Sequence, residues 1–456
     1  MPAPTNGSAY GETEPLLGQQ QPQQQSRWKA LPKHIAAVTW ATLSSNYANV
    51  FLVFVPLGII AGALHWSPTS VFILNFIAII PLAALLSFAT EELSAKLGDS
   101  LGGLLNATFG NAVELIVSIV ALREGEIRIV QSSMLGSILS NILLVLGCCF
   151  LAGGIRQQES EFNSTVASTM SSLMAVSSAS LIIPATLYAA LRTSTDEETD
   201  KNILLLSHGT SIILLLLYIL YLVFQLHTHK NLFKQDQSKK NKRDIEARAQ
   251  AQAEQQGESS ASASTSPTEP AEPEEEVEEE EAGQILSPIA AGIALVLVTI
   301  LVAVCAEYLV DSIDSIVQTA HISKTFIGLV LLPIVGNAAE HVTAVIVAYK
   351  GKMDLAINVA IGSSMQIALF VTPFLVILGW IMDKPMTLHF QSFETVVFFL
   401  SVLVVNYLIQ DGKSNYLEGA MCLGTYTIIA LAFYVYPDDA KGDLSDSFFR
   451  NLWGRN

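Results

Sequence analysis

The sequence predicts an all-α integral membrane protein with about 11 transmembrane helices, arranged as one helix followed by two five-helix halves of inverted topology. Composition is the first reason, because 51% of the 456 residues are hydrophobic and only 14% are charged, against roughly a quarter charged in soluble domains. The apolar residues also come in long blocks, and a bilayer span needs about 20 of them. An internal repeat, described below, is the third reason.

Eleven blocks of the chain are long and apolar enough to cross a bilayer. Six precede a hydrophilic stretch and five follow it, so the first block stands outside two sets of five. The blocks lie at about 46–64, 70–92, 103–123, 129–153, 165–190 and 202–225, then at 285–310, 325–349, 355–381, 392–410 and 416–436.

These blocks divide the chain into six segments. We expect, in order, a disordered cytoplasmic N-terminus (1–35), an extra first transmembrane helix (36–66), a first five-helix half (67–225), a cytoplasmic linker with an acidic tract (226–283), a second five-helix half (284–436) and a C-terminal tail (437–456).

The formal net charge of −17 does not indicate a basic partner, because much of the acid lies in one tract, Glu272–Glu281. No basic patch interleaved with aromatic residues is visible in the sequence, which argues against a nucleic-acid partner. The sequence also shows neither a nucleophile paired with a base nor a phosphate-binding loop. It therefore predicts no enzyme and no cofactor.

Basic residues beside the spans indicate the orientation of the chain. Arg27, Lys29 and Lys33 precede the first span, and a second basic group follows the sixth, at Lys230, Lys234, Lys239, Lys240, Lys242 and Arg243. Basic residues gather on the cytoplasmic side of a membrane, and six spans return the chain to the face it left. The N-terminus and central loop are therefore expected in the cytoplasm, and the C-terminus on the opposite side.

Two segments of the chain repeat one motif at a constant spacing. Gly110-Asn-Ala-Val-Glu114 corresponds to Gly336-Asn-Ala-Ala-Glu340, and Gly136-Ser137 corresponds to Gly362-Ser363. The offset is 226 residues in both cases (336 − 110 and 362 − 136). Equal register across a helix, a turn and a helix indicates internal duplication. Because each half has an odd number of spans, the second half enters the membrane from the opposite side.

The glycines of the motif mark expected helix breaks. Transporters with inverted repeats hold their substrate near the membrane midplane, on broken helices where the halves meet. We expect breaks at Gly110-Asn111 and Gly336-Asn337, with an open backbone whose free carbonyls just upstream face an ion. Close helix packing through glycine is the alternative for either position.

Glu114 and Glu340, one turn past these breaks, are the expected cation ligands. An ionised carboxylate deep in a bilayer is costly unless it is paired, hydrated or bound to a cation. Protonation, or a place near water at a helix end, would explain one such glutamate. Two at equivalent positions of an inverted pair are expected to converge and form a divalent-cation site.

Ca²⁺ takes about six to eight oxygen ligands, so neighbouring polar residues are expected to contribute. The next helix of each half offers hydroxyl and amide oxygens at Ser137, Ser140, Ser363 and Gln366. Asn111 and Asn337 are expected to satisfy the broken backbone, with contact to the ion as the alternative.

Longer runs surround the motif. They are Glu91-Glu92, Gly103 to Glu114, Ser137 to Gly147, Ile327 to His341 and Gly362 to Phe370. At these residues, and over about 35–436, the sequence resembles the cation/proton exchanger family of the calcium/cation antiporter superfamily. The likeness is closest to the fungal vacuolar Ca²⁺/H⁺ exchangers.

The resemblance implies roles for particular residues. The two repeat glutamates are the central cation- and proton-binding groups of that family, which assigns these roles to Glu114 and Glu340. His341 belongs to the family pattern, with tuning of proton release and hydrogen-bonded packing as alternatives. Glu91 and Glu92 look like a family feature at a span end, with an interfacial or access role. A calcium-sensing acidic element is implied for Glu274, Glu275, Glu276, Glu278, Glu279, Glu280 and Glu281, although runs of like charge are normally solvated.

The resemblance thus implies a vacuolar antiporter that moves cytosolic Ca²⁺ into an acidic lumen in exchange for H⁺ by alternating access. Protons would displace the cation because nearby carboxylates titrate as a coupled unit. The run from Glu12 to Leu17 is similar to an acidic dileucine signal for vacuolar or lysosomal membranes. Alternatives are a Mn²⁺/H⁺ or Na⁺/Ca²⁺ exchanger, an ion channel and a non-transporting scaffold. The expected partners are Ca²⁺ or Mn²⁺, protons and membrane lipid, and the oligomeric state stays open.

Overall fold

The computed structural model describes Thr42 and residues 46–191, 196–229 and 286–436. By their contacts, Met1–Ser45 form one unit and Asn46–Asn456 another. All elements named below lie in Asn46–Asn456. The segment 1–35 with its dileucine motif, the acidic tract and the C-terminal tail lie outside the described residues.

The first half is almost entirely helical. Its elements are the 3₁₀ helix η1 (Tyr47–Val53), α2 (Phe54–Ala63), α3 (Pro68–Phe109), α4 (Ala112–Glu124), α5 (Ile127–Leu139), the π-helical turn η2 (Ser140–Val145), α6 (Leu146–Arg156), the strand β1 (Ser160–Glu161), α7 (Ser164–Leu191), α8 (Asp196–Val223) and the π-helical turn η3 (Phe224–Thr228).

The second half follows the same plan. Its elements are α10 (Pro288–Asp311), α11 (Ile313–Ala320), α12 (Lys324–Phe326), the π-helical turn η4 (Ile327–Leu331), α13 (Leu332–Gly336), α14 (Ala338–Tyr349), α15 (Met353–Gln366), the π-helical turn η5 (Ile367–Val371), α16 (Thr372–Ile381), α17 (Ser392–Leu408), the strand β2 (Lys413–Ser414) and α18 (Tyr416–Val435).

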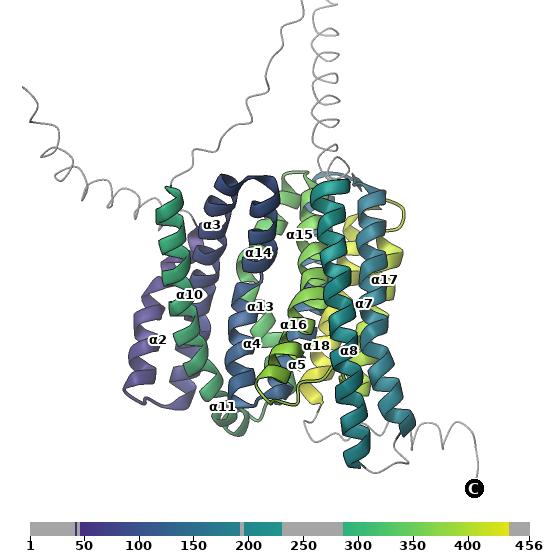
Figure 1. Cartoon of the computed structure of the whole chain (residues 1–456). Helices are drawn as coiled ribbons and strands as arrows, with labels where there is room; N and C mark the ends of the chain where they lie inside the picture. The colour runs from purple at the N-terminus through teal and green to yellow at the C-terminus, as the bar shows by residue number, and fades with distance from the viewer. Residues whose placement is uncertain (1–41, 43–45, 192–195, 230–285, 437–456) are drawn as a thin grey trace, which may run out of the picture. The chain divides into compact units, whose positions relative to one another are not determined.

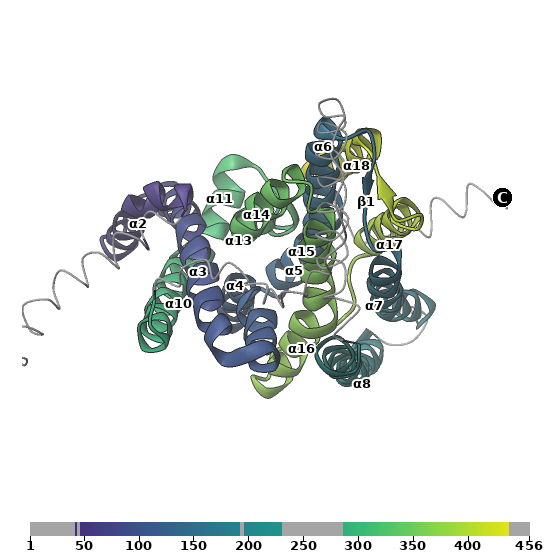
Figure 2. The same ribbon diagram turned by 90° about the horizontal axis from the view of Figure 1, so that it is seen from above.

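The two halves interlock. The long helix α10 packs along α3, and α5 packs against η4, so first-half helices contact second-half helices directly. Seen from above, α2, α3 and α10 lie on one side, α7, α8 and α17 on the other, and α5 and α13–α15 between them (Figure 2). The strands β1 and β2 join the halves at one face, where Ser160 pairs with Ser414 in antiparallel register.

Local sequence explains where several helices begin and end. The hydroxyl of Ser67 accepts from the Ser70 amide before Pro68, and Ser287 caps α10 in the same way before Pro288. Such caps satisfy amides that have no partner in the first helical turn. After α4 and α14, Gly125 and Gly351 have positive φ angles of 85° and 77°, a conformation that glycine adopts without strain. These two glycines are also 226 residues apart.

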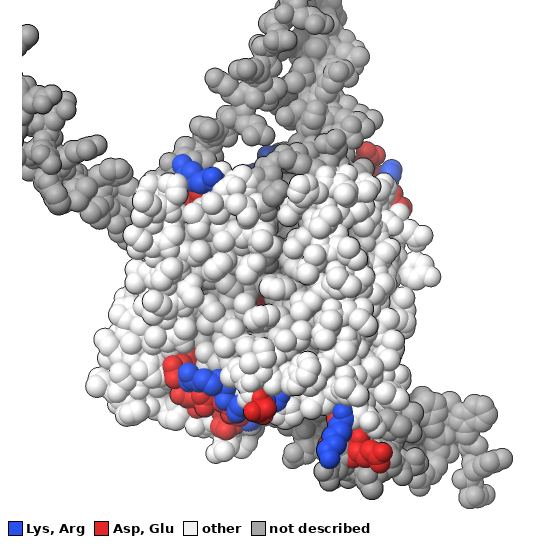
Figure 3. Space-filling model, in the orientation of Figure 1, with Lys and Arg blue, Asp and Glu red and all other residues white. Residues whose placement is uncertain are grey.

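Most described helices are suited to a bilayer. Among the described residues, seven helices are long and apolar enough to cross a membrane, and a bent pair, Ile313–Ala320 with Lys324–Gly336, brings the number to eight. Shorter apolar helices cover Tyr47–Ala63, Ala338–Tyr349 and Ser392–Leu408. On the face in Figure 3, charged side chains gather near the two ends, and the band between them is nearly free of charge.

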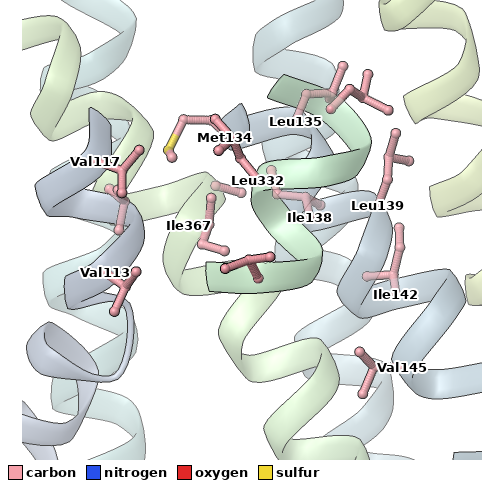
Figure 4. Packing of buried hydrophobic residues seen from close by; sticks show 14 of the residues in the cluster. Val113, Val117, Met134, Leu135, Ile138, Leu139, Ile142, Val145, Leu332 and Ile367 are labelled. Atoms are coloured by element: carbon pink, nitrogen blue, oxygen red, sulfur yellow. The ribbon is translucent and has the colours of Figure 1, made fainter. Parts of the chain in front are cut away.

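The core is a continuous apolar cluster around α5 and α15. Buried residues of α4, α5 and η2 meet residues of α13 and η5 from the other half, as Figure 4 shows for Val113, Met134, Ile138, Leu332 and Ile367. The same helices that carry the repeated polar motifs therefore also form the packed centre of the protein.

The predicted all-α membrane architecture is confirmed, with differences in detail. The span expected at 70–92 belongs to a longer helix, α3, which is interrupted at Gly98 (φ 77°, ψ 171°) and continues to Phe109. The first expected span, 46–64, consists of a 3₁₀ helix followed by a ten-residue α-helix. The sequence between 310 and 325, expected as a loop, contains α11.

Candidate functional site

The two expected breaks lie between α3 and α4 and between α13 and α14, but the backbone there is less open than predicted. Gly110 keeps helical angles (φ −57°, ψ −37°), and Asn111 and Asn337 depart from them only moderately. The Gly110 amide still donates to Asn106 O at 2.8 Å, and the Asn337 amide to Pro333 O at 3.0 Å. The expectation of free upstream carbonyls was wrong for these two, because one helical hydrogen bond survives at each break.

The glycines at the breaks both lie beside the glutamate of the opposite half, and Gly336 makes room for it. A Cβ atom on Gly336 would lie 2.9 Å from Oε1 of Glu114, and one on Gly110 would lie 3.6 Å from Oε1 of Glu340. Each carboxylate therefore reaches across to the break in the other half. The structure brings Glu114 and Glu340 together at the point where the halves meet.

The two carboxylates differ in their surroundings. Glu114 is 6% exposed, and its Oε1 has no hydrogen-bond partner among the described residues. Glu340 is half-buried, and its Oε2 accepts a hydrogen bond from Ser363 Oγ at 2.9 Å. Burying a carboxylate oxygen without a hydrogen-bond donor costs folding free energy unless a cation or a water molecule binds to it.

The asparagines of the breaks bond across the interface in a symmetric pattern. Asn337 Nδ2 donates to Ser137 Oγ at 3.2 Å, and Ser363 Oγ donates to Asn111 Oδ1 at 3.1 Å. Asn111 Nδ2 also donates to Gln366 Oε1 at 2.7 Å. Asn337 Nδ2 also donates to the carbonyl of Pro333 at its break, at 3.1 Å. Both asparagines therefore mainly join one half to the other.

The remaining expected residues, Ser140 and His341, lie beside this network. His341 Nε2 is 3.5 Å from Ser140 Oγ and 3.3 Å from Asn141 Oδ1. Asn141 was not among the expected site residues, although it is 1% exposed and also donates to Ser363 Oγ at 3.3 Å. Its repeat counterpart is the apolar Ile367, so comparison of the two repeats gave no signal for it.

A cavity of about 340 Å³ leads to Glu340. Polar side chains line it, namely Ser87, Thr90, Glu91, Asn106, Gln225, Thr343 and Asn358. Gln225 lies in η3, close to Thr228 where the described part of α8 and η3 ends, so the cavity opens toward that end of the molecule. Glu91 thus faces the approach to the site, whereas Glu92 Oε2 accepts from the Leu286 amide at 2.9 Å, just before α10.

Glu114 faces a different and much smaller space. This pocket of about 20 Å³ is lined by Ser133, Ser137 and Gly336 and otherwise by apolar side chains. Such a volume holds about one water molecule. In this conformation the site is therefore reached from the side of Glu340, and Val117, Leu309 and Leu332 close the other side.

The site offers oxygen ligands and no cluster of soft ones. Within residues 46–191, 196–229 and 286–436, no group of three or more His, Cys, Asp or Glu side chains is placed to hold a metal. Two carboxylates with serine hydroxyls, amide oxygens and water form a set suited to a hard cation such as Ca²⁺. A site that must release its ion gains from having few charged ligands, because each anionic ligand tightens binding.

Comparisons with known proteins identify the family of the chain. The family described as sodium/calcium exchanger protein matches residues 67–227 and 290–435. A vacuolar calcium ion transporter of Schizosaccharomyces pombe is 51% identical over 427 residues, covering 93% of each chain. A Ca²⁺/H⁺ antiporter of Aphanothece halophytica is 41% identical over 386 residues, 85% of this chain and 95% of the relative.

Solved structures show the same relationship. The Ca²⁺/H⁺ antiporter protein YfkE has 33% sequence identity and a TM-score of 0.64, over 85% of this chain and 99% of its own. The resemblance expected from the sequence is confirmed. The chain belongs to the sodium/calcium exchanger protein family and, within it, to the cation/proton exchangers.

Proposed function

We propose that this protein is a vacuolar calcium/proton antiporter, which moves cytosolic Ca²⁺ into an acidic lumen in exchange for H⁺ by alternating access. The observation that carries the proposal is the reciprocal placement of the two glutamates, each against the helix break of the opposite half. The names of relatives that align along most of this chain, a vacuolar calcium ion transporter and Ca²⁺/H⁺ antiporters, support it.

In this proposal Glu114 and Glu340 bind either Ca²⁺ or protons. Supporting oxygens come from Asn111, Asn337, Ser137, Ser140, Ser363 and Gln366, with His341 beside them. Two carboxylates in a desolvated site resist carrying two charges at once, so either a divalent cation or protons must neutralise them. The protein changes slowly between its two access states when the site is empty and doubly charged, because bare carboxylates would face a low dielectric. Calcium movement is thereby tied to proton movement.

The proposed orientation rests on the cavity and the charged loops. The central linker leaves the described chain after His229 and returns at Leu286, on the side toward which the Glu340 cavity opens. With that linker in the cytoplasm, as its basic residues indicate, the conformation seen here faces the cytosol and is ready to accept Ca²⁺. Glu91 would attract the cation at the entrance, and the carboxyl end of α18 would face the lumen.

Radiolabelled Ca²⁺ uptake into reconstituted vesicles with an acidic interior tests the function. We expect uptake that requires the pH gradient, is insensitive to sodium and is competed by Mn²⁺ if the site accepts both cations. Glu114→Gln and Glu340→Gln should each abolish uptake, since one carboxylate alone neither neutralises Ca²⁺ nor couples it to protons. Glu307→Gln, at a surface glutamate beside Arg123, serves as the control.

Retained uptake in both active-site variants would refute the assignment of the two glutamates. Uptake driven by sodium and indifferent to pH would instead favour a Na⁺/Ca²⁺ exchanger.

A further inference from the structure

At two pairs of matched positions, one half of the site has a polar residue where the other has an apolar one. His341 corresponds to Leu115 (341 − 115 = 226), and Asn141 corresponds to Ile367 (367 − 141 = 226). The two polar residues contact each other, with His341 Nε2 3.3 Å from Asn141 Oδ1. Their counterparts are both apolar and pack in the core. One arm of the site therefore has a polar bridge between the halves where the other arm has hydrocarbon.

The bridge is part of a directed chain of hydrogen bonds. The amide oxygen of Asn141 only accepts, so His341 Nε2 carries the hydrogen of their contact. Asn141 Nδ2 then donates to Ser363 Oγ at 3.3 Å, and Ser363 Oγ donates to Glu340 Oε2 at 2.9 Å. A hydroxyl has one hydrogen, so Ser363 donates to Glu340 Oε2 or to Asn111 Oδ1 at any one time, and accepting from Asn141 leaves that hydrogen for these two acceptors.

Glu114 has no such support. Its Oε1 is buried without a hydrogen-bond partner among the described residues, and the residue that corresponds to Ser363, Ser137, accepts instead from Asn337 at 3.2 Å. The matched helices thus hold one carboxylate by a chain of donors and leave an oxygen of the other unpaired. Chains of hydrogen bonds in a low-dielectric interior strengthen one another.

We propose that Asn141 is a positioning residue, which holds Glu340 through Ser363 as the fixed ligand of the cation site, while Glu114 is the adaptable ligand that moves onto the ion. This deepens the proposed function and rests on it. Asn141 itself touches neither carboxylate. Its position in the π-helical turn η2 brings a first-half side chain against two second-half helices, α14 and α15, and such turns often occur at functional sites.

A double-mutant cycle tests the bridge by introducing the side chains found at the matched positions of the other half, Ile367 and Leu115. Asn141→Ile and His341→Leu, made singly and together, convert the polar pair into the apolar pair of the other half. We expect each single variant to raise the KM for Ca²⁺ roughly tenfold, near the upper end for the loss of one neutral hydrogen bond, with a smaller change in kcat. The double variant should resemble the single ones, because both act through one chain. Ser364→Ala, a buried neighbour bonded only to backbone carbonyls, should leave the KM unchanged.

A spectroscopic measurement keeps this inference separate from the proposed function. In the ¹⁵N spectrum of the histidine-labelled full chain, the signal lost in His341→Leu identifies His341. We expect it to report one tautomer, with the hydrogen on Nε2, and to report mixed tautomers in Asn141→Ile. If the wild-type protein takes up no calcium, the exchanger function is wrong. The spectrum would still show whether Asn141 fixes the tautomer of His341. Additive effects on KM, an unchanged KM, or a His341 signal indifferent to Asn141→Ile would overturn the positioning role.

Discussion

At the scale of single residues, Gly336 determines how closely Glu114 approaches the opposite half. A Cβ atom on Gly336 would lie 2.9 Å from Glu114 Oε1, so the missing side chain makes room for that carboxylate. The matched glycine, Gly110, has helical angles, and a Cβ atom on it would lie 3.6 Å from Glu340 Oε1 but only 2.6 Å from Asn106 O. The close contact between glycine and glutamate is therefore made at one of the two breaks.

Gly336→Ala should therefore impair transport. The new methyl group would lie 2.9 Å from Glu114 Oε1, closer than van der Waals contact, and would push the carboxylate away from the ion. Because small displacements of a reacting group cost up to about 100-fold, we expect initial uptake to fall at least tenfold, roughly. Gly292→Ala, where no atom lies within 4 Å, is the matched control. Equal uptake by both variants would show that the close approach of Glu114 to Gly336 is not needed for transport.

Residue types and spacing predicted which side chains meet where the halves join, but they could not predict the hydrogen bonds between them. The offset of 226 residues identified Glu114, Glu340 and the serines and amides that surround them. It could not identify Asn141, whose role depends on the irregular turn η2 and on contacts with the other half. Nor could it show that Asn111 and Asn337 bond across the interface, since both partners are more than 190 residues away.

At the scale of elements, matched glycines have unequal packing roles. A Cβ on Gly136 would overlap the backbone of Leu329, at the crossing of α5 and η4, whereas a Cβ on Gly362 would meet only Met170 Cε at 3.7 Å. The difference arises because the π-helical turn η4 lies against α5, whereas Gly362 has no close backbone neighbour among the described residues.

Gly136→Ala is accordingly expected to destabilise the protein, whereas Gly362→Ala is tolerated. Overpacking of a tight crossing costs typically about 1–3 kcal/mol, and here the opposing atoms are backbone that cannot turn aside. Thermal unfolding of the detergent-solubilised protein measures the difference. Similar midpoints for the two variants would mean that the α5–η4 crossing relaxes at little cost.

A second cross-half contact joins the starts of helices. Arg128, at the start of α5, forms a bidentate ion pair with Glu394 at the start of α17, and its guanidinium also donates to Thr325 Oγ1 at 3.1 Å. The repeat counterpart of Arg128 is Asp354 (354 − 128 = 226), which accepts from the Asn163 amide just before α7 at 2.7 Å. Each face of the molecule thus has a polar contact that joins one half to the other.

Arg128→Ala should strongly lower stability, because the side chain of Glu394 is 0% exposed and would remain as an unpaired buried charge. Removing one partner of a buried pair costs about 3–5 kcal/mol. Lys413→Ala removes a pair with Glu159 that lies in solvent, so its unfolding midpoint should match the wild type. A wild-type midpoint for Arg128→Ala would show that water or another cation replaces the guanidinium.

At the scale of the whole molecule, alternating access requires two faces with different exposure. The cavity at Glu340 opens toward the end that carries Thr228 and Pro288, and the chain reaches the other end at α11 and after α18 (Figure 1). The apolar blocks predicted a helical membrane protein, whereas seven or eight of the described helices, not eleven, are long and apolar enough to cross a membrane. The sequence could not predict which face of the site is open, because that depends on how the helices around the breaks pack.

Cysteine labelling in intact vacuoles tests the orientation of the two faces. Lys413→Cys lies in β2, at the face where α18 begins, and Ala320→Cys lies at the end of α11 on the other face; both positions are exposed. An impermeant thiol reagent should modify Lys413→Cys from outside and reach Ala320→Cys only after detergent is added. The reverse pattern would place the central linker in the lumen and contradict the proposed direction of transport.

The position of the bound ion tests the central claim most directly. At neutral pH with Ca²⁺ present, an experimental density map should show one cation between the carboxylates of Glu114 and Glu340, with oxygens of both within roughly 2.3–2.6 Å of it. A cation held by only one of the two glutamates, or bound elsewhere while both carboxylates stay apart from it, would contradict the account.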